Sequence, residues 1–96
     1  MTQEEIKKEL AQIEKEIFEL DKQRIIAKEE LSILISARRL VEKGYRECPF
    51  LNLSIMNEKF LEEKIKEYTD KVDNLARKTN KLLKERDRLL YQLERS

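Results

Sequence analysis

The chain is poor in the residues that make turns and reactive sites. Its 96 residues include one glycine, one proline, one cysteine, no histidine and no tryptophan. Because glycine and proline are the strongest signals for turns, a chain with so few of them is expected to form few, long elements. Three tyrosines and three phenylalanines are also few for a thick hydrophobic core. The sequence therefore disfavours a globule with many connections.

The same shortages exclude most catalytic and metal-binding arrangements. Without histidine the chain has no histidine-based catalytic triad and no ordinary zinc site. A single glycine is too few for a glycine-rich phosphate loop. The many carboxylates fall mainly on the solvent faces of the expected helices, so we interpret them as surface charges. We predict that the protein is not an enzyme and has no metal site or cofactor.

The charge balance gives no general attraction to nucleic acid or to a membrane. Lys and Arg number 21 against 20 Asp and Glu, a formal charge of +1. No apolar run exceeds three residues, so we expect no membrane-spanning helix and no membrane partner. The first residues are acidic, unlike a secretory signal, and the lone Cys48 forms no internal disulfide. We expect a cytoplasmic location.

The first half of the chain carries apolar residues at alternating spacings of four and three, the pattern of a coiled-coil seam. Thr2 and Glu5 have the spacing of a capping box, which starts a helix. Gly44 supplies the left-handed residue that often ends one. The sequence therefore predicts a helix over 2–43. Its seam consists of Ile6, Leu10, Ile13, Ile17, Leu20, Arg24, Ala27, Leu31, Leu34, Arg38 and Val41.

The second half keeps the same rhythm and predicts a helix over 57–95. Asn57 is a suitable cap for its start, and Ser54 is a competing one. Its seam consists of Leu61, Ile65, Tyr68, Val72, Leu75, Thr79, Leu82, Arg86, Leu89 and Leu93.

The segment 44–56 contains the glycine and the proline and shows no helical pattern, so we expect the chain to reverse there. Thirteen residues are few for strands between the helices. Antiparallel pairing of the seams places Ile6 by Leu93 and Leu34 by Ile65, and the midpoint of these pairs falls in the turn. The predicted fold is all-α: one long antiparallel helical hairpin, a coiled coil, forming a single domain over 1–96.

Charge blocks agree with this pairing. Residues 1–33 hold 6 bases and 9 acids, net −3, whereas residues 76–96 hold 7 bases and 3 acids, net +4. Antiparallel folding lays the two blocks together. For single pairs the agreement is mixed, because Glu30 is expected to face Lys71 while Glu16 is expected near Glu85.

Arg24 and Arg86 are two of the three arginines on the seams. We interpret them as residues that fix the register or extend their long stems out to neighbouring acids. The alternative is a break in the seam that admits a partner helix.

Apolar residues outside the seam exceed what one hairpin buries. Burying a Leu or Ile side chain stabilises by about 1.5–3 kcal/mol, so several exposed ones favour association. We predict a homo-oligomer, a two-fold dimer in the simplest case, that forms a four-helix or larger bundle. Its interface is expected to include Ile25, Ile26, Ile33, Ile35, Leu40, Leu83 and Leu90.

The segment around the turn concentrates aromatic, apolar and arginine side chains, the types enriched at protein interfaces. We expect it to be a partner-binding tip. The alternative is that its apolar residues only close the end of the bundle. The expected tip residues are Arg38, Arg39, Tyr45, Arg46, Phe50, Leu51, Leu53 and Phe60.

These features predict a non-enzymatic module for protein–protein interaction or assembly. An adaptor, a chaperone-like hairpin and an inhibitor hairpin all fit, binding to itself and to another protein. The alternative is an accessory protein for nucleic acid that uses a basic cluster of Arg38, Arg39, Lys43 and Arg46 near the tip. That signal is weak because no aromatic residues alternate with these bases.

Overall fold

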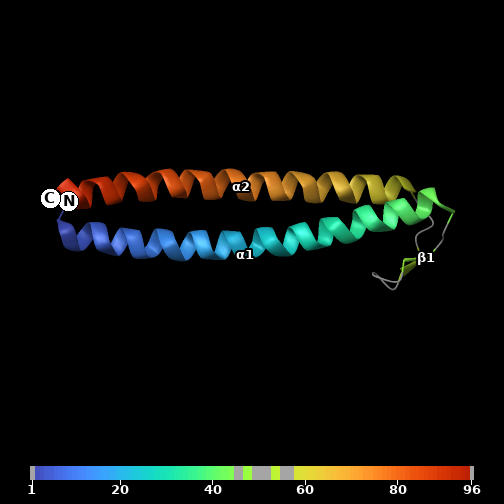
Figure 1. Cartoon of the computed structure of the whole chain (residues 1–96), viewed down its shortest axis with the longest axis horizontal. Coiled ribbons are helices and arrows are strands. Elements are labelled where there is room, and N and C mark those ends of the chain that lie inside the picture. Colours follow the sequence, from blue (N-terminus) through green and yellow to red (C-terminus); the bar gives the residue numbers. More distant parts are fainter. Residues whose placement is uncertain (1, 45–46, 49–52, 55–57, 96) are drawn as a thin grey trace. The chain divides into compact units, whose positions relative to one another are not determined.

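The computed structural model describes residues 2–44, 47–48, 53–54 and 58–95. Its elements, in chain order, are α1 (Gln3–Glu42), β1 (Glu47–Cys48), β2 (Leu53–Ser54) and α2 (Glu58–Arg95), as Figure 1 shows. The two helices hold nearly all of the described residues. The chain is an all-α helical hairpin, which confirms the predicted fold class.

Helix α1 begins and ends where the sequence predicts, within one residue. The backbone N–H of Glu5 donates to the Thr2 hydroxyl at 3.2 Å, so Thr2 caps the helix. At the other end, Gly44 has a φ of +93° and its N–H donates to the carbonyl of Val41 at 2.9 Å. A positive φ is strained for residues with a side chain, so the only glycine of the chain stands at the position that requires one.

Helix α2 begins at Glu58 and ends at Arg95. The predicted start and end of this helix were 57 and 95. Asn57, the expected cap, lies outside the described residues. The helix therefore matches the uninterrupted seam pattern of the second half.

The segment between the helices contains strands that the sequence analysis did not expect. Strands β1 and β2 pair antiparallel, with Glu47 opposite Ser54 and Cys48 opposite Leu53. Thirteen residues suffice because each strand has only two residues. The expectation of a plain reversal without strands was wrong.

The chain divides into two compact units, which we describe separately. Unit 1 comprises Met1–Arg24 and Asn74–Ser96, and unit 2 comprises Ile25–Asp73. Each unit contains a segment of α1 and a segment of α2, so each has a seam of its own.

The core of unit 1 is built from seam positions of both helix segments. Ile6, Leu10, Ile13 and Leu89 form a buried cluster, and further seam residues pack against it. The predicted partners Leu10 and Leu89 are both in this cluster, which supports the predicted register here. The residues packed against the cluster are Ile17, Leu82 and Leu93.

The core of unit 2 includes residues beyond the seam. Leu34, Ala37 and Leu61 form its buried cluster, although Ala37 is not a seam position. The small Ala37 side chain is fully covered, which widens the packed face of α1 in this unit. The residues packed against the cluster are Leu40, Val41, Ile65 and Tyr68.

Candidate protein-interaction site

The predicted interface residues differ in how much their own chain covers them. Ile25, Ile26 and Leu90 are exposed, so their side chains are available to a partner. Leu40 instead packs on the core of unit 2. The half-buried members are Ile33, Ile35, Leu40 and Leu83.

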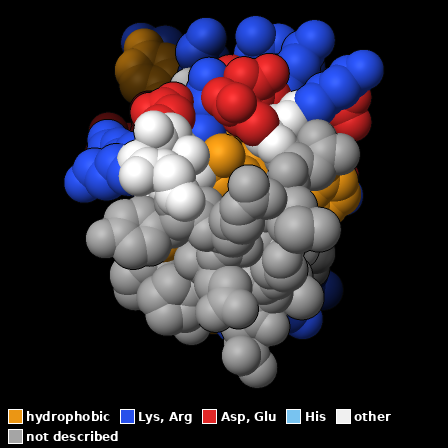
Figure 2. All heavy atoms as spheres, turned by 90° about the vertical axis from the view of Figure 1, so that its right-hand side faces the viewer, with side chains coloured by type: hydrophobic (Ala, Val, Ile, Leu, Met, Phe, Trp, Pro, Cys, Tyr) orange, Lys and Arg blue, Asp and Glu red, His pale blue; other side chains and the backbone are white. Residues whose placement is uncertain are grey.

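The structure describes only part of the predicted tip. Tyr45, Arg46, Phe50 and Leu51 lie outside the described residues, and Leu53 is described only as backbone of β2. Of the other members, Arg39 and Phe60 are exposed and Arg38 is half-buried. Figure 2 shows Lys and Arg side chains intermixed with Asp and Glu at this end of the molecule. The described side chains here are therefore of mixed charge.

Arg38 connects the two helix segments of unit 2. Its Nη2 lies 3.1 Å from Oε1 of Glu62 on α2, and its Nε lies 3.6 Å from Oε1 of Glu42 on its own helix. Two carboxylates neutralise this guanidinium locally. Arg38 therefore has acidic neighbours on both helices and bridges α1 and α2.

Phe60 presents an aromatic face beside a base. The ammonium nitrogen of Lys64 lies 5.9 Å from the centre of the Phe60 ring, and the same nitrogen lies 3.3 Å from Oε2 of Glu67. More than half of Phe60 is exposed. An exposed aromatic ring bordered by a cation is a favourable contact for another protein.

Glu30 meets an aromatic residue instead of the expected lysine. A hydrogen bond from the Tyr68 hydroxyl to the Glu30 carboxylate, with the negative charge of that group, raises the pKa of Tyr68 above its usual value. Lys71 lies with its Nζ 5.6 Å from the centre of the Tyr68 ring. Tyr68 thus stands between Glu30 and Lys71.

The two carboxylates expected to repel each other in unit 1 each have a local donor. Gln12 Nε2 donates to Oε1 of Glu16 at 3.2 Å. Glu85 accepts hydrogen bonds from Arg88, one of them at 3.1 Å, and these bonds lower the pKa of Glu85 while raising that of Arg88. Glu9 adds a further attraction to Arg88 across the two helix segments. Short-range pairs therefore offset the unfavourable charges at this level of the seam.

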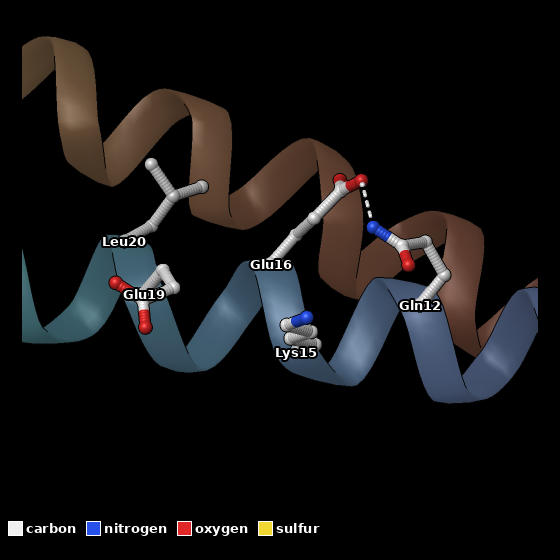
Figure 3. A pocket seen from close by; sticks show the side chains of 5 residues that line it. All are labelled: Gln12, Lys15, Glu16, Glu19 and Leu20. Carbon is white, nitrogen blue, oxygen red and sulfur yellow. Dashed lines mark hydrogen bonds between the residues drawn. The ribbon is translucent and has the colours of Figure 1, made fainter.

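A hollow in unit 1 has a volume of about 350 Å³ (Figure 3). Leu20 and Glu16 point towards α2, and the remaining lining side chains are polar. Most of the exposed lining surface of this hollow is apolar, but its side chains offer no nucleophile with an adjacent base. We assign it no chemistry. The lining residues are Gln12, Lys15, Glu16, Glu19 and Leu20.

The described residues contain neither a metal-binding cluster nor a membrane-spanning helix. No group of three or more His, Cys, Asp or Glu side chains among them is arranged to hold a metal ion. No described helix has the length and apolar character needed to cross a membrane.

Sequence reasoning missed two exposed aromatic residues in unit 1. Phe18 has an exposed fraction of 67% and Tyr91 one of 57%. The Tyr91 ring has the Arg95 guanidinium 5.1 Å from its centre. Phe18 lies seven residues after Ala11, at the same position of the heptad, so a search for apolar repeats beside the seam would have found it.

Comparison of the chain with protein-family models, with curated proteins and with solved structures found no match.

Proposed function

We propose that the protein is a non-enzymatic assembly module that binds a second copy of itself, and another protein through its tip, by contacts between helices. The observation that carries the proposal is the exposure of large apolar side chains beside seams that are already filled. Phe18, Ile25 and Leu90 belong to this exposed set. Covering each of them stabilises an assembly by about 1.5–3 kcal/mol.

Within the described residues, the filled seams leave these side chains exposed. In unit 1, Leu10 and Leu89 already fill the seam, and Leu89 has an exposed fraction of 0%. Rotating α2 to bury the neighbouring Leu90 would expose Leu89, because adjacent residues point about 100° apart on a helix. A surface from another chain covers Leu90 without that loss.

The mass of the protein in solution tests self-association. Light scattering after gel filtration, repeated over a range of concentrations, is expected to give about 23 kDa or a larger multiple of the 11.6 kDa chain. A mass of one chain throughout the micromolar range would contradict the proposal. Far-ultraviolet circular dichroism on the same fractions confirms that the measured species is helical.

The tip is the proposed surface for another protein. Phe60 supports this because its aromatic side chain has an exposed fraction of 52% and lies beside the Lys64 ammonium. Phe60→Ala is expected to weaken capture of that partner from a lysate while leaving self-association unchanged. Lys66→Ala, an exposed residue on the same helix, is the matched control.

The nucleic-acid alternative loses support from the pairing of Arg38 with Glu42 and Glu62. Of the other members of that cluster, Arg39 and Lys43 are exposed and Arg46 lies outside the described residues. We expect no salt-dependent binding of DNA or RNA at physiological ionic strength. The single cysteine suits a reducing compartment, and we propose a cytoplasmic location on that basis.

A further inference from the structure

The face of α2 that points away from its seam carries two short rows of charge, one in each unit. Both rows occupy the heptad positions farthest from the seam, and all of their side chains are exposed. The row in unit 2 is acidic and the row in unit 1 is basic. We call them the acidic row, Glu63, Glu67 and Asp70, and the basic row, Lys81, Lys84 and Arg88.

Charges within the same chain leave most of these side chains unpaired. Two members of each row form no ion pair with any described residue, namely Glu63, Asp70, Lys81 and Lys84. Glu67 pairs with Lys64, less than one turn before it. Arg88 pairs with Glu85 of its own helix. Within the described structure, the acidic block of α1 therefore does not neutralise Lys81 or Lys84.

The separation of the two signs along α2 is the feature that calls for a partner. A surface that serves only solubility is expected to carry both signs interspersed. The chain has 21 bases and 20 acids, yet no base interrupts the acidic row and no acid interrupts the basic one. Asn74 and Arg77 fill the same positions between the rows, so the sign changes once. A helix face with one change of sign is complementary to a second copy of itself in the antiparallel direction.

The spacing of the rows gives this pairing a register. Along the acidic row the intervals are four and then three residues, and along the basic row they are three and then four. Each row is thus the reverse of the other, so one antiparallel alignment brings every acid level with a base of the other copy. The three levels are Asp70 with Lys81, Glu67 with Lys84, and Glu63 with Arg88. A parallel alignment would place each row against the same row, and like charges repel.

Residues beside the rows mostly favour the same register. In an antiparallel pair, corresponding flanks of the two helices face each other. Four flanking pairs at neighbouring levels have a charge on both residues. Three of them are attractive: Lys59 with Glu94, Lys64 with Glu85, and Lys66 with Asp87. The fourth pair, Lys71 with Lys78, is repulsive and lies near the middle of the contact.

We propose that the acidic row of one copy binds the basic row of a second copy, with the two α2 helices antiparallel about a two-fold axis. Unit 2 of each copy thus contacts unit 1 of the other. This inference rests on the proposed self-association and assigns it a surface and an orientation. Leu90 lies beside the seam on another face of α2, so a contact that covers Leu90 leaves these rows free.

Reversal of single charges tests the contact at the level where both residues are unpaired. Asp70→Lys and Lys81→Glu each turn two symmetry-related attractions into repulsions. At low ionic strength each is expected to raise the concentration of half-association about tenfold. The double variant restores the attraction in reverse and is expected to return near the wild-type value. Sedimentation equilibrium measures the association, and circular dichroism confirms that each variant keeps its helices.

Two variants on α1 control for net charge. Glu29→Lys and Lys22→Glu make the same charge changes at exposed positions that face away from the seam, and both are expected to leave association unchanged. Ionic strength gives a second readout. Added salt screens exposed charges, so it is expected to weaken wild-type association and to reduce the difference between the wild type and the single variants.

The outcomes separate this inference from the proposed function. Association that is insensitive to salt and to both single reversals overturns the charged contact and leaves self-association standing. Single variants that weaken association without recovery in the double variant overturn the pairing of Asp70 with Lys81. An equal loss in the α1 controls also overturns it, because general charge would then explain the effect. A wild-type protein that is monomeric throughout overturns both the inference and the proposed self-association.

Discussion

Unit 1 and unit 2 contain segments of the same two helices but cover their apolar residues differently. In unit 1 the buried cluster uses only seam positions, while Phe18 and Leu90 remain outside it. In unit 2 the core also takes in Ala37 and Leu40, which are not seam positions. Unit 2 thus packs two residues from outside the seam into its core, although Ile25 and Ile26 of the same unit remain exposed.

An apolar residue outside the seam of a helical hairpin is not necessarily an interface residue. The width of the apolar face alone does not identify an interface, because Leu40 belongs to a wide face and still packs inside the chain. The informative residues are those left exposed next to a completed seam, such as Leu90 beside the fully buried Leu89. Ile25 and Ile26 in unit 2 and Phe18 and Leu90 in unit 1 are the exposed residues of this kind.

The largest expected effects come from the buried leucines of the two cores. Leu89→Ala in unit 1 and Leu61→Ala in unit 2 each remove a side chain with almost no exposure, so each is expected to cost about 2–5 kcal/mol of unfolding free energy. Urea denaturation monitored by circular dichroism measures the loss.

Leu90→Ala is the control for this comparison, because it removes the same atoms from a residue that is 39% exposed. Measured at a concentration where the chain is monomeric, its loss is expected to be well below that of Leu89→Ala. Equal losses at Leu89 and Leu90 would mean that the seam of unit 1 is placed on the wrong face of α2.

The seam arginines are expected to produce the next largest effect, in the stabilising direction. Arg24 pairs with Asp21 of its own helix at 3.2 Å, and the buried Nε atoms of both Arg24 and Arg86 have no hydrogen-bond partner in the described structure. Replacing a poorly paired seam residue by an apolar one often raises the free energy of unfolding, here by about 1 kcal/mol or more. Arg24→Leu and Arg86→Leu are each expected to raise the melting temperature and to broaden the range of assembly states.

A loss of stability in both leucine variants, with one assembly state retained, would contradict this interpretation of the arginines. Light scattering on each variant distinguishes a change of assembly from a change of folding. Arg77→Leu is the matched control, because Arg77 is exposed on α2 away from the seam.

Removing the contact between Arg38 and Glu62 is expected to change the free energy of unfolding less, and only through unit 2. It joins α1 to α2 at 3.1 Å, whereas Arg24 pairs within its own helix. A double-mutant cycle with Arg38→Met and Glu62→Gln is expected to give a coupling energy of about 0.2–1 kcal/mol, because both side chains are partly exposed. A coupling energy of zero would show that this pair adds nothing to the packing of unit 2.

The long elements and their ends were predictable from the sequence. The capping pair Thr2 and Glu5, the glycine after α1 and the two seam patterns each have a direct physical meaning, and the helices match them closely. Strands β1 and β2 were not predictable in this way, because two-residue strands are too short to show an alternating pattern.

The candidate site was only partly predictable. Leu83 and Leu90 were identified from the spacing on their own helix, whereas Phe18, seven residues after Ala11, was missed. Individual charge pairs were also missed, since they depend on side-chain rotamers that spacing does not determine. Glu30 was expected to face Lys71, and in the structure it accepts a hydrogen bond from Tyr68.

The smallest expected effect concerns the ionisation of Tyr68 in unit 2. The hydrogen bond to Glu30 and the charge of that carboxylate favour the neutral phenol, so Tyr68 is expected to titrate above its usual pKa of about 10. Because the folded pKa is raised, the stabilisation is fully present below the unfolded pKa and is lost as the pH rises through the folded pKa. The loss of stabilisation therefore begins at a pH of about 10 and continues as the pH rises.

Carbon-13 NMR of tyrosine labelled at the ring carbon that bears the hydroxyl measures this titration, and Tyr68→Phe identifies the signal. Glu30→Gln is expected to lower the pKa of Tyr68 towards its usual value, because it removes the charge that opposes ionisation. Glu67→Gln is the matched control, since Glu67 acts on Tyr68 only as a weaker nearby charge. An equal shift in both variants would mean that general charge, rather than the contact between Glu30 and Tyr68, controls this group.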